Sequence, residues 1–359
     1  MVGIVGYGTW IPFNRIKVEE INRVWKNADL NRIKNVLQLN ERAVLQPNED
    51  VITLGVGAAE RAIEHSASDK SRIGAAFLGT CTNPYDSRPS VTTVGEALGL
   101  RNDVFSGDIQ FAGKSGTTAM QMCMGLIKSG MADQALSIGS DTINRHTCPG
   151  RFAEYSASAG AAAFVLGKDE VIATIEGTAS YATELSDFFR VEGERYIQDI
   201  GDGGKIYPAF EVGMFEHVSK ASQALFEQVG LNPEDYDFAV FQQPYGVIPY
   251  TLGERLGFKK EQIEQGVVST QIGDCGAASS LLGLANVLDS AKAGQKIFVA
   301  SYGFGAGADA FSIRTTPLIE QRRPKLSVAQ ILANKRVVDY AIASRLEYKY
   351  AQDMSPLYL

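Results

Sequence analysis

Two spacings of apolar residues take turns along this chain. Short apolar runs predict strands at 3–11, 72–80, 105–112, 134–141, 159–167, 171–180, 236–243, 266–273, 295–303 and 309–316. Apolar residues at helical spacing predict helices at 17–28, 50–65, 90–99, 114–130, 213–229, 246–256 and 276–293. Strands that alternate with helices indicate an α/β fold.

The order of the elements repeats once, with an offset of roughly 160 residues. In each half an apolar strand leads into a helix of small residues, at 114–130 and 276–293, and two strands follow. Helices rich in Ala, Ser and Gly allow close backbone approach, which suits a helix buried between two sheets. We therefore expect two similar halves, 1–170 and 171–316, packed as layers around these two helices. A charged helical tail, 317–359, is expected to cover an edge or contact another chain.

One long segment, 186–212, has weak periodicity and many Gly, Asp and aromatic residues. Such composition is typical of a long loop near a functional site.

Composition argues against a nucleic-acid-binding protein, a membrane protein and a disulfide-bonded secreted protein. The chain has 359 residues, 45% of them hydrophobic, and a formal net charge of −7 without a dense block of Lys and Arg. These values predict no nucleic-acid or membrane partner. No signal peptide or transmembrane run is predicted, and four scattered cysteines predict neither disulfides nor a zinc site, so we expect a cytoplasmic protein without metal or cofactor. The three histidines are predicted at the surface: His65, His146 and His217.

Two glycine-containing sequences suggest nucleotide-binding motifs but do not meet the requirements of those motifs. The sequence AGKSG suggests a phosphate loop, but five residues of an apolar strand separate Gly107 from Gly113, where that motif needs four. The sequence GFGAG at 303–307 suggests a dinucleotide fingerprint, but a strand follows it, not a helix. A hairpin turn is the better interpretation, although its backbone N–H groups could still face a ligand carbonyl.

The most informative stretch is GDIQFAGKSGTTAMQMCMGLIKSGMA, residues 107–132. It predicts a strand, a tight turn and a helix of small residues. Enzymes that form acyl-thioester intermediates place a nucleophilic Cys at such a turn, where the N-terminus of the helix favours the thiolate. In this chain the turn position is Gly113.

Motifs spread over nearly the whole chain, through about residue 316, carry a family resemblance. They are IVGYGTWIP, LGTCTNPYDSRPS, VGEALG, DIQFAGKSGT, EYSASAGAAAFVLG, FQQP, IGDCGAASS and SYGFGAG. Together they resemble the thiolase superfamily, on the branch of 3-hydroxy-3-methylglutaryl-CoA synthases and ketoacyl synthase III. The resemblance implies a thiolase fold, two similar βαβαβ halves in five α-β-α-β-α layers, and a homodimer.

Active members of this family use a Cys, a His, an Asn and a Glu. The matching positions here are Glu96 in VGEALG, Gly113, Gln242 in FQQP and Asp274 in IGDCG. Only the Glu is kept. Glycine cannot form a thioester, glutamine does not titrate, and an ionised Asp would repel an oxyanion.

No other residue in the sequence is a good replacement for the missing catalytic groups. Ser115 lies one step into the helix and lacks a base, and Cys275, Cys81 and Cys148 are interpreted as structural. Glu96 is either a structural carboxylate or a retained polar group of the pocket.

The losses favour a non-catalytic relative. In finer detail the chain resembles the synthase-like A subunits of bacterial monoacetylphloroglucinol acetyltransferases, in VWKNADL, ERAVLQPNEDVITLG and the tail KYAQDMSPLYL. That resemblance implies a structural subunit of a CoA-independent C-acyltransferase acting on acetylated phloroglucinols. A thiolase-like partner would carry the nucleophilic Cys, and a small zinc-ribbon/OB-fold subunit would join the two.

Two alternatives stay open. The chain could be an autonomous thioester-condensing or decarboxylating enzyme that uses Glu96 and Gln242. It could also be a binding module whose pocket holds a phenolic or acyl ligand.

Overall fold

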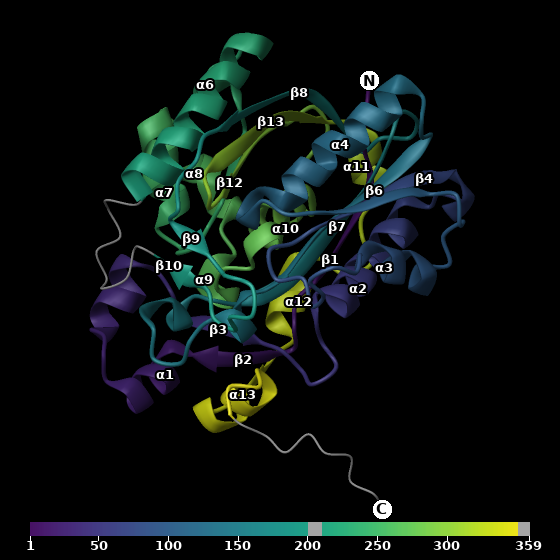
Figure 1. Ribbon diagram of the computed structural model, residues 1–359. Helices are drawn as coiled ribbons and strands as arrows, with labels where there is room; N and C mark the ends of the chain where they lie inside the picture. Colours follow the sequence, from purple (N-terminus) through teal and green to yellow (C-terminus); the bar gives the residue numbers. More distant parts are fainter. Residues whose placement is uncertain (200–209, 351–359) are drawn as a thin grey trace, which may run out of the picture.

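A mixed nine-stranded sheet forms the centre of the computed structural model, which describes residues 1–199 and 210–350 (Figure 1). Its strand order is β11-β12-β13-β8-β1-β7-β6-β4-β5. The strands span Gly3–Trp10 (β1), Ile73–Gly79 (β4), Phe105–Ile109 (β5), Gln134–Thr142 (β6), Ala159–Gly167 (β7), Ala173–Ala182 (β8), Phe238–Phe241 (β11), Lys296–Gly303 (β12) and Gly307–Thr315 (β13). The α/β class expected from the sequence is confirmed.

The sheet consists of two groups of strands that meet at a narrow seam. Strands β1, β4, β5, β6 and β7 form one group, and β8, β11, β12 and β13 form the other. Between the groups, β1 and β8 pair through only Gly3 with Thr174 and Ile4 with Ala173. The seam lets the sheet bend, so that the two groups of strands can face one another across buried helices.

Helices of small residues occupy the middle of this arrangement. α4 (Ser115–Ser129) packs on β4 and β6 and also reaches β8, where Gln121 Nε2 donates to Thr178 Oγ1 at 2.7 Å. α10 (Ser279–Leu288) packs on β1 and β7 of one group and on β11 and β12 of the other. Both helices therefore lie between the two groups of strands, as their composition predicts.

Larger amphipathic helices cover the outer faces. α2 (Val51–Ser66) packs on β1, β6 and β7, and α3 (Val91–Leu98) lies beside it. α6 (Glu216–Val229) covers β8 and β13. The remaining helices are α1 (Val18–Trp25), α7 (Ile248–Leu256), α8 (Lys260–Ile263), α9 (Ser269–Ile272), α11 (Leu318–Gln321), α12 (Val328–Ala333) and α13 (Tyr340–Leu346). No helix in the described parts of the chain is long and apolar enough to cross a membrane.

The charged tail is anchored to the N-terminal region. β14 (Arg336–Val337) pairs with β2 (Asn14–Lys17), which also pairs with β3 (Glu41–Val44). After α13, Glu347 forms a buried ion pair with Arg42 of β3. The tail thus adds the third strand to a small sheet. The last residues of the predicted tail, 351–359, lie outside the described part of the chain.

The strand predicted at 266–273 is wrong. This segment forms a short 3-10 turn and α9, because the side chain of Gln243 takes the hydrogen bonds that strand pairing would use. Gln243 Oε1 accepts from the backbone N–H groups of Val268 and Ser269 at 2.8 and 3.0 Å, and its Nε2 donates to Gly266 O at 2.9 Å.

Two of the three histidines are not at the surface. His65 is 7% exposed and its ring contacts the backbone of Tyr7 and of Arg322, so burial lowers its pKa. His217 is 3% exposed and lies between Thr183 Oγ1 and Gly213 O. The surface prediction fails because both rings pair with backbone or hydroxyl groups, which helical spacing does not reveal.

Candidate active site

The turn before α4 holds Gly113 in a space too small for a side chain. A Cβ added at this residue would lie 2.5 Å from the backbone oxygen of Tyr302 and 2.6 Å from Gln242 Nε2. Contacts this short are not tolerated in folded proteins, where packed atoms sit near van der Waals separation. Residue 113 therefore has neither a nucleophilic side chain nor room for one, because Gln242 and the Tyr302 backbone occupy that volume.

Gln242 lies directly after β11 and fills that volume from the other half of the chain. Its backbone N–H donates to Ala300 O at 2.9 Å, and its side-chain Nε2 donates to Gly276 O at 2.9 Å. The residue is completely buried and does not line the pocket described below. In this structure Gln242 packs and bonds behind the site, while its Oε1 has no hydrogen-bond partner among the described residues, and its action on a substrate stays a prediction.

Asp274 stands at the start of the turn that leads into α10. A pair of backbone hydrogen bonds holds it in place, from Asp274 N to Ser156 O at 2.7 Å and from Ser158 N to Asp274 O at 2.9 Å. Its Oδ1 accepts the N–H of Gly276 at 2.9 Å. Burial raises the pKa of Asp274 to about 6; the Gly276 N–H opposes this rise, and the negative charge of Asp141 adds to it.

A second carboxylate, missed by sequence reasoning, lies beside the first. Asp141 ends β6, is fully buried, and accepts from the hydroxyls of Thr80 and Thr82 at 2.8 and 2.6 Å and from the N–H of Ala277 at 2.7 Å. Burial nevertheless raises its pKa. Its place at the end of a strand, beside a turn into a central helix, is the signal that could have identified it.

Gly276 is the residue that lets both carboxylates approach this turn. Its φ is +56°, a conformation that favours glycine, and a Cβ there would lie 2.3 Å from Asp141 Oδ2. Gly276, the second glycine in GDCG, therefore permits the contact between Asp141 and the first turn leading to α10.

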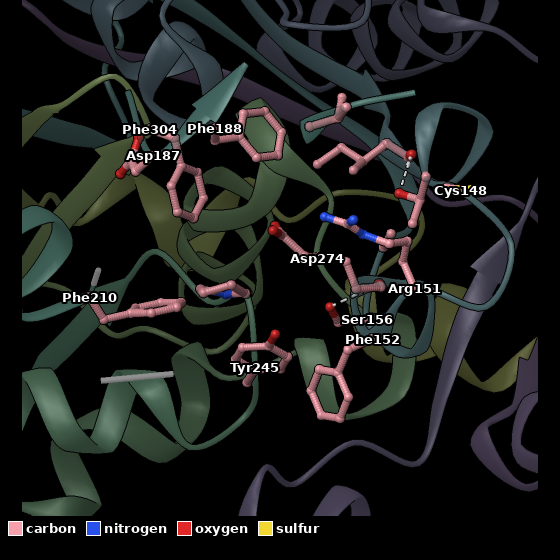
Figure 2. A pocket seen from close by; sticks show the side chains of 16 residues that line it. Cys148, Arg151, Phe152, Ser156, Asp187, Phe188, Phe210, Tyr245, Asp274 and Phe304 are labelled. Carbon is pink, nitrogen blue, oxygen red and sulfur yellow. Dashed lines mark hydrogen bonds between the residues drawn. The ribbon is translucent and has the colours of Figure 1, made fainter. Parts of the chain in front are cut away.

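A pocket with a cavity volume of about 100 Å³ opens in front of Asp274 (Figure 2). Figure 2 shows the carboxyl group of Asp274 and the guanidinium group of Arg151 reaching into the same space. Aromatic side chains form much of the wall, from loops of both halves: Phe152, Phe188, Phe210, Tyr245 and Phe304. An apolar pocket with a few convergent polar groups is the usual form of a small-molecule site.

The predicted loop 186–212 contributes to this wall, as expected. Asp187, Phe188, Ile197 and Phe210 line the pocket, while 200–209 lie outside the described residues. Asp187 holds the loop to the β12–β13 hairpin, because its carboxylate accepts from Tyr302 OH and from Gly305 N, both at 2.8 Å. The GFGAG stretch is therefore a hairpin turn, as predicted, and one of its N–H groups is already bonded to a side chain of the protein.

The structure does not bring Glu96 into this site. Its side chain is exposed on α3 and has no hydrogen-bonding or ionic partner among the described residues. Helical spacing in VGEALG places Val94 and Leu98 inward and leaves Glu96 on the solvent side. In this structure Glu96 does not meet Gln242, so a catalytic pairing of the two stays a prediction.

Of the other candidate nucleophiles, Ser115 is bonded within its own turn, Cys275 and Cys81 are held in buried or acidic surroundings, and Cys148 lies at the pocket. Ser115 Oγ donates to Ala112 O at 2.8 Å and accepts from Phe111 N at 2.7 Å, within its own turn. Cys275 is buried, and burial raises the pKa of its thiol. Burial and the neighbouring Asp141 also raise the pKa of Cys81, whereas Cys148 lines the pocket wall.

Of the four positions taken from the family, only Asp274 faces the pocket. Gly113 and Gln242 lie close behind it, linked through Gly276. The geometry does not support acyl transfer to a nucleophile at residue 113. It does supply a carboxyl group of pKa about 6 that can take and return a proton in a largely apolar pocket.

Comparison with known proteins shows a matching family model and similar proteins that align with nearly the whole chain. Residues 226–315 match the family model described as the C-terminal region of 3-oxoacyl-[acyl-carrier-protein] synthase III. The chain is 43% identical over 350 residues to a hydroxymethylglutaryl-CoA synthase of Methanocaldococcus jannaschii, covering 97% of this chain and 99% of that protein. The synthase of Methanobrevibacter smithii is 42% identical with the same coverage.

Solved structures show the same thiolase fold that the motifs implied. One is a crystal structure of an HMG-CoA synthase complexed with CoA, which has a TM-score of 0.87 at 20% identity and covers 98% of this chain and 91% of that chain. Another is 3-oxoacyl-[acyl-carrier-protein] synthase III of Aquifex aeolicus, with a TM-score of 0.80 at 22% identity, covering 88% and 100%.

The expectation of a non-catalytic structural subunit is corrected by these relatives. They match this chain from end to end and are named as synthases, which points to an autonomous catalytic enzyme. The inference from missing groups failed because it treated the loss of one covalent route as the loss of all chemistry at the pocket.

Proposed function

Because the chain belongs to the hydroxymethylglutaryl-CoA synthase family, we propose that it is an autonomous enzyme that condenses an acyl thioester with a carbon nucleophile. The thioester is bound without covalent attachment, since residue 113 has no side chain and no room for one. The observation that carries the proposal is Asp274, a carboxyl group of pKa about 6 that faces a pocket walled by aromatic side chains.

Asp274 moves the proton in this scheme. Its carboxylate removes the proton from an enolic or phenolic hydroxyl, and the activated carbon attacks the thioester carbonyl carbon. The new C–C bond forms as the C–S bond breaks, and Asp274 returns the proton to the departing thiolate sulfur. A base of pKa about 6 suits a hydroxyl of this kind far better than an unactivated C–H group.

Arg151 is placed to assist the same step. Its guanidinium group reaches into the space in front of Asp274, where negative charge would develop on the thioester oxygen (Figure 2). A fixed cation in an apolar pocket stabilises such charge more strongly than it would in water.

The acceptor we propose is flat and ring-bearing. Five aromatic side chains around the pocket support this class, because offset and edge-to-face contacts favour an aromatic or conjugated ligand. The finer sequence resemblance implies an acylated phloroglucinol as the substrate, and this identity stays a proposal. The homodimer implied by the superfamily resemblance also stays a proposal.

Thiol release by the purified chain tests the function. The chain alone is incubated with an acetyl thioester and a phenolic or enolic acceptor, while free thiol and C-acylated product are followed. We expect both to appear in equal amounts, and we expect Asp274→Asn to reduce the rate at least 100-fold with its folding intact. Thiol release without C-acylated product, or unchanged activity in Asp274→Asn, would contradict the proposal.

A further inference from the structure

A second cavity lies away from the aromatic pocket, where β1, the end of α2, the end of α10 and the segment before α12 meet. Its cavity volume is about 370 Å³. Four cationic and two acidic side chains line it, together with polar groups of β1: Arg61, Arg322, Arg323, Lys325, Glu64, Asp289 and Tyr7.

Two of the cations, Arg61 and Arg323, have no carboxylate within ion-pair distance in the described parts of the chain. Arg61 stacks over the ring of Trp10 at 4.5 Å and donates one hydrogen bond to Thr9 O at 2.6 Å. Arg323 donates to Leu288 O and Ala291 O, at 2.7 and 2.6 Å. A guanidinium group has five N–H donors in a rigid fork, so each retains donors beyond these contacts.

The other two cations are already paired. Arg322 forms an ion pair with Glu170, and Lys325 forms one with Glu64. The carboxylate of Asp289 is bonded inside the fold, accepting from Tyr7 OH at 2.8 Å and from Val328 N at 2.6 Å. Arg61 is attracted by the charges of Glu60 and Glu64, and Arg323 by that of Asp289, but neither guanidinium group forms a direct ion pair with these carboxylates.

Bonding of carbonyl groups at a helix end explains the position of Arg323 but not that of Arg61. Arg323 binds carbonyl groups at and just beyond the C-terminal end of α10, where cations are favoured by the helix dipole. Arg61 makes no such contact with a helix end, and its stacking on Trp10 fixes the guanidinium plane at the wall of the cavity. Planar, preorganised guanidinium groups are the preferred partners of phosphate and carboxylate oxygens.

We propose that this cavity is a binding site for a small anion of the phosphate or polycarboxylate class, held between Arg61 and Arg323. The site does not depend on the function proposed for the aromatic pocket. Its volume suits a small molecule, and its two anchored guanidinium groups supply paired donors on opposite chain segments.

Calorimetric titration of the full chain with inorganic pyrophosphate tests the site. We expect saturable binding with one ion per chain, weakened at least tenfold by Arg61→Gln and by Arg323→Gln. Arg323→Gln removes two hydrogen bonds to carbonyl groups at the end of α10 and Arg61→Gln removes the Trp10 stack, so urea denaturation of each variant checks that the fold is kept. The matched control is Arg23→Gln, which removes the same charge from an exposed pair on α1.

Three results would overturn the proposal. These are no binding of pyrophosphate at millimolar concentration, binding by Arg323→Gln as tight as that of the wild type, and binding weakened by Arg23→Gln as much as by the cavity variants. The last result would show diffuse electrostatic attraction in place of a site. Binding of an acidic peptide without any binding of pyrophosphate would likewise assign the surface to a protein partner.

Discussion

The side-chain nitrogen of Gln242 lies 2.6 Å from the point where a Cβ on Gly113 would stand. The two residues come from different halves of the chain, yet the glycine and the glutamine fit one another and could not both be enlarged. Gln242 also contacts the turn before α10, because its side-chain Nε2 donates a hydrogen bond to Gly276 O. The loss of a nucleophile at residue 113 is thus built into the packing behind the pocket.

Gly113→Ala should destabilise the fold by about 1–3 kcal/mol, because the new methyl group overpacks against Gln242 and the Tyr302 backbone. Urea denaturation measures this change. The matched control is Gly125→Ala in the middle of α4, where an added Cβ meets nothing within 4 Å. That substitution should be neutral or should stabilise by about 0.5–1 kcal/mol. Equal effects at the two glycines would show that residue 113 is not closely packed.

Asp274 should make the stability depend on pH in a defined direction. Its pKa is about 6 in the folded chain and about 3.9 when unfolded, so the folded state binds more protons between these values. The free energy of unfolding therefore falls as pH rises from about 4 to about 6, and the loss is complete above that range.

Asp274→Asn removes the fall in the free energy of unfolding that titration of Asp274 causes as pH rises. Relative to the wild type, the variant should gain stability as pH rises, reaching up to about 3 kcal/mol at pH 7 and above. Urea denaturation of both proteins at pH 5 and pH 8 gives the comparison, in which the other titrating groups cancel. A difference that is the same at both pH values would show that Asp274 does not have a raised pKa.

The sequence predicted the framework better than the site. Small-residue composition correctly placed α4 and α10 in the centre, and glycine spacing correctly assigned the β12–β13 hairpin. Glu96 was misplaced because a motif match carries no information on which helix face meets the pocket. Asp141, Asp187 and the aromatic wall come together from four separate segments, so their proximity depends on tertiary packing that local patterns do not encode.

The buried pair between Arg42 and Glu347 should be essential for attaching the tail. Their side chains are 1% and 0% exposed, and Lys349 lies 3.3 Å from Glu347 and 2.9 Å from Glu154. Glu347→Gln leaves Arg42 and Lys349 buried with less opposing charge, so we expect a loss of about 3–5 kcal/mol in the free energy of unfolding.

An exposed pair provides the comparison for this change. Glu211 pairs with Arg255 at the surface, so Glu211→Gln should cost less than about 1 kcal/mol. Both values come from urea denaturation at one pH. If Glu347→Gln costs no more than Glu211→Gln, the tail is not held by the buried charges.

Glu96→Gln should leave both activity and stability nearly unchanged. Its carboxylate is exposed and bonded to no described residue, so we expect a change within twofold in kcat/KM and within about 0.5 kcal/mol in stability. Steady-state kinetics on the condensation reaction measures the first. A loss of tenfold or more would place Glu96 in the catalytic machinery after all.

Intact-protein mass spectrometry during turnover tests the central claim most directly. The chain alone is sampled while an acetyl thioester and a phenolic or enolic acceptor react, and the protein mass is read beside the yield of C-acylated product. We predict that product accumulates while the protein mass stays unchanged. Absence of product from the chain alone, or an acetyl group attached to any residue during turnover, would contradict the account.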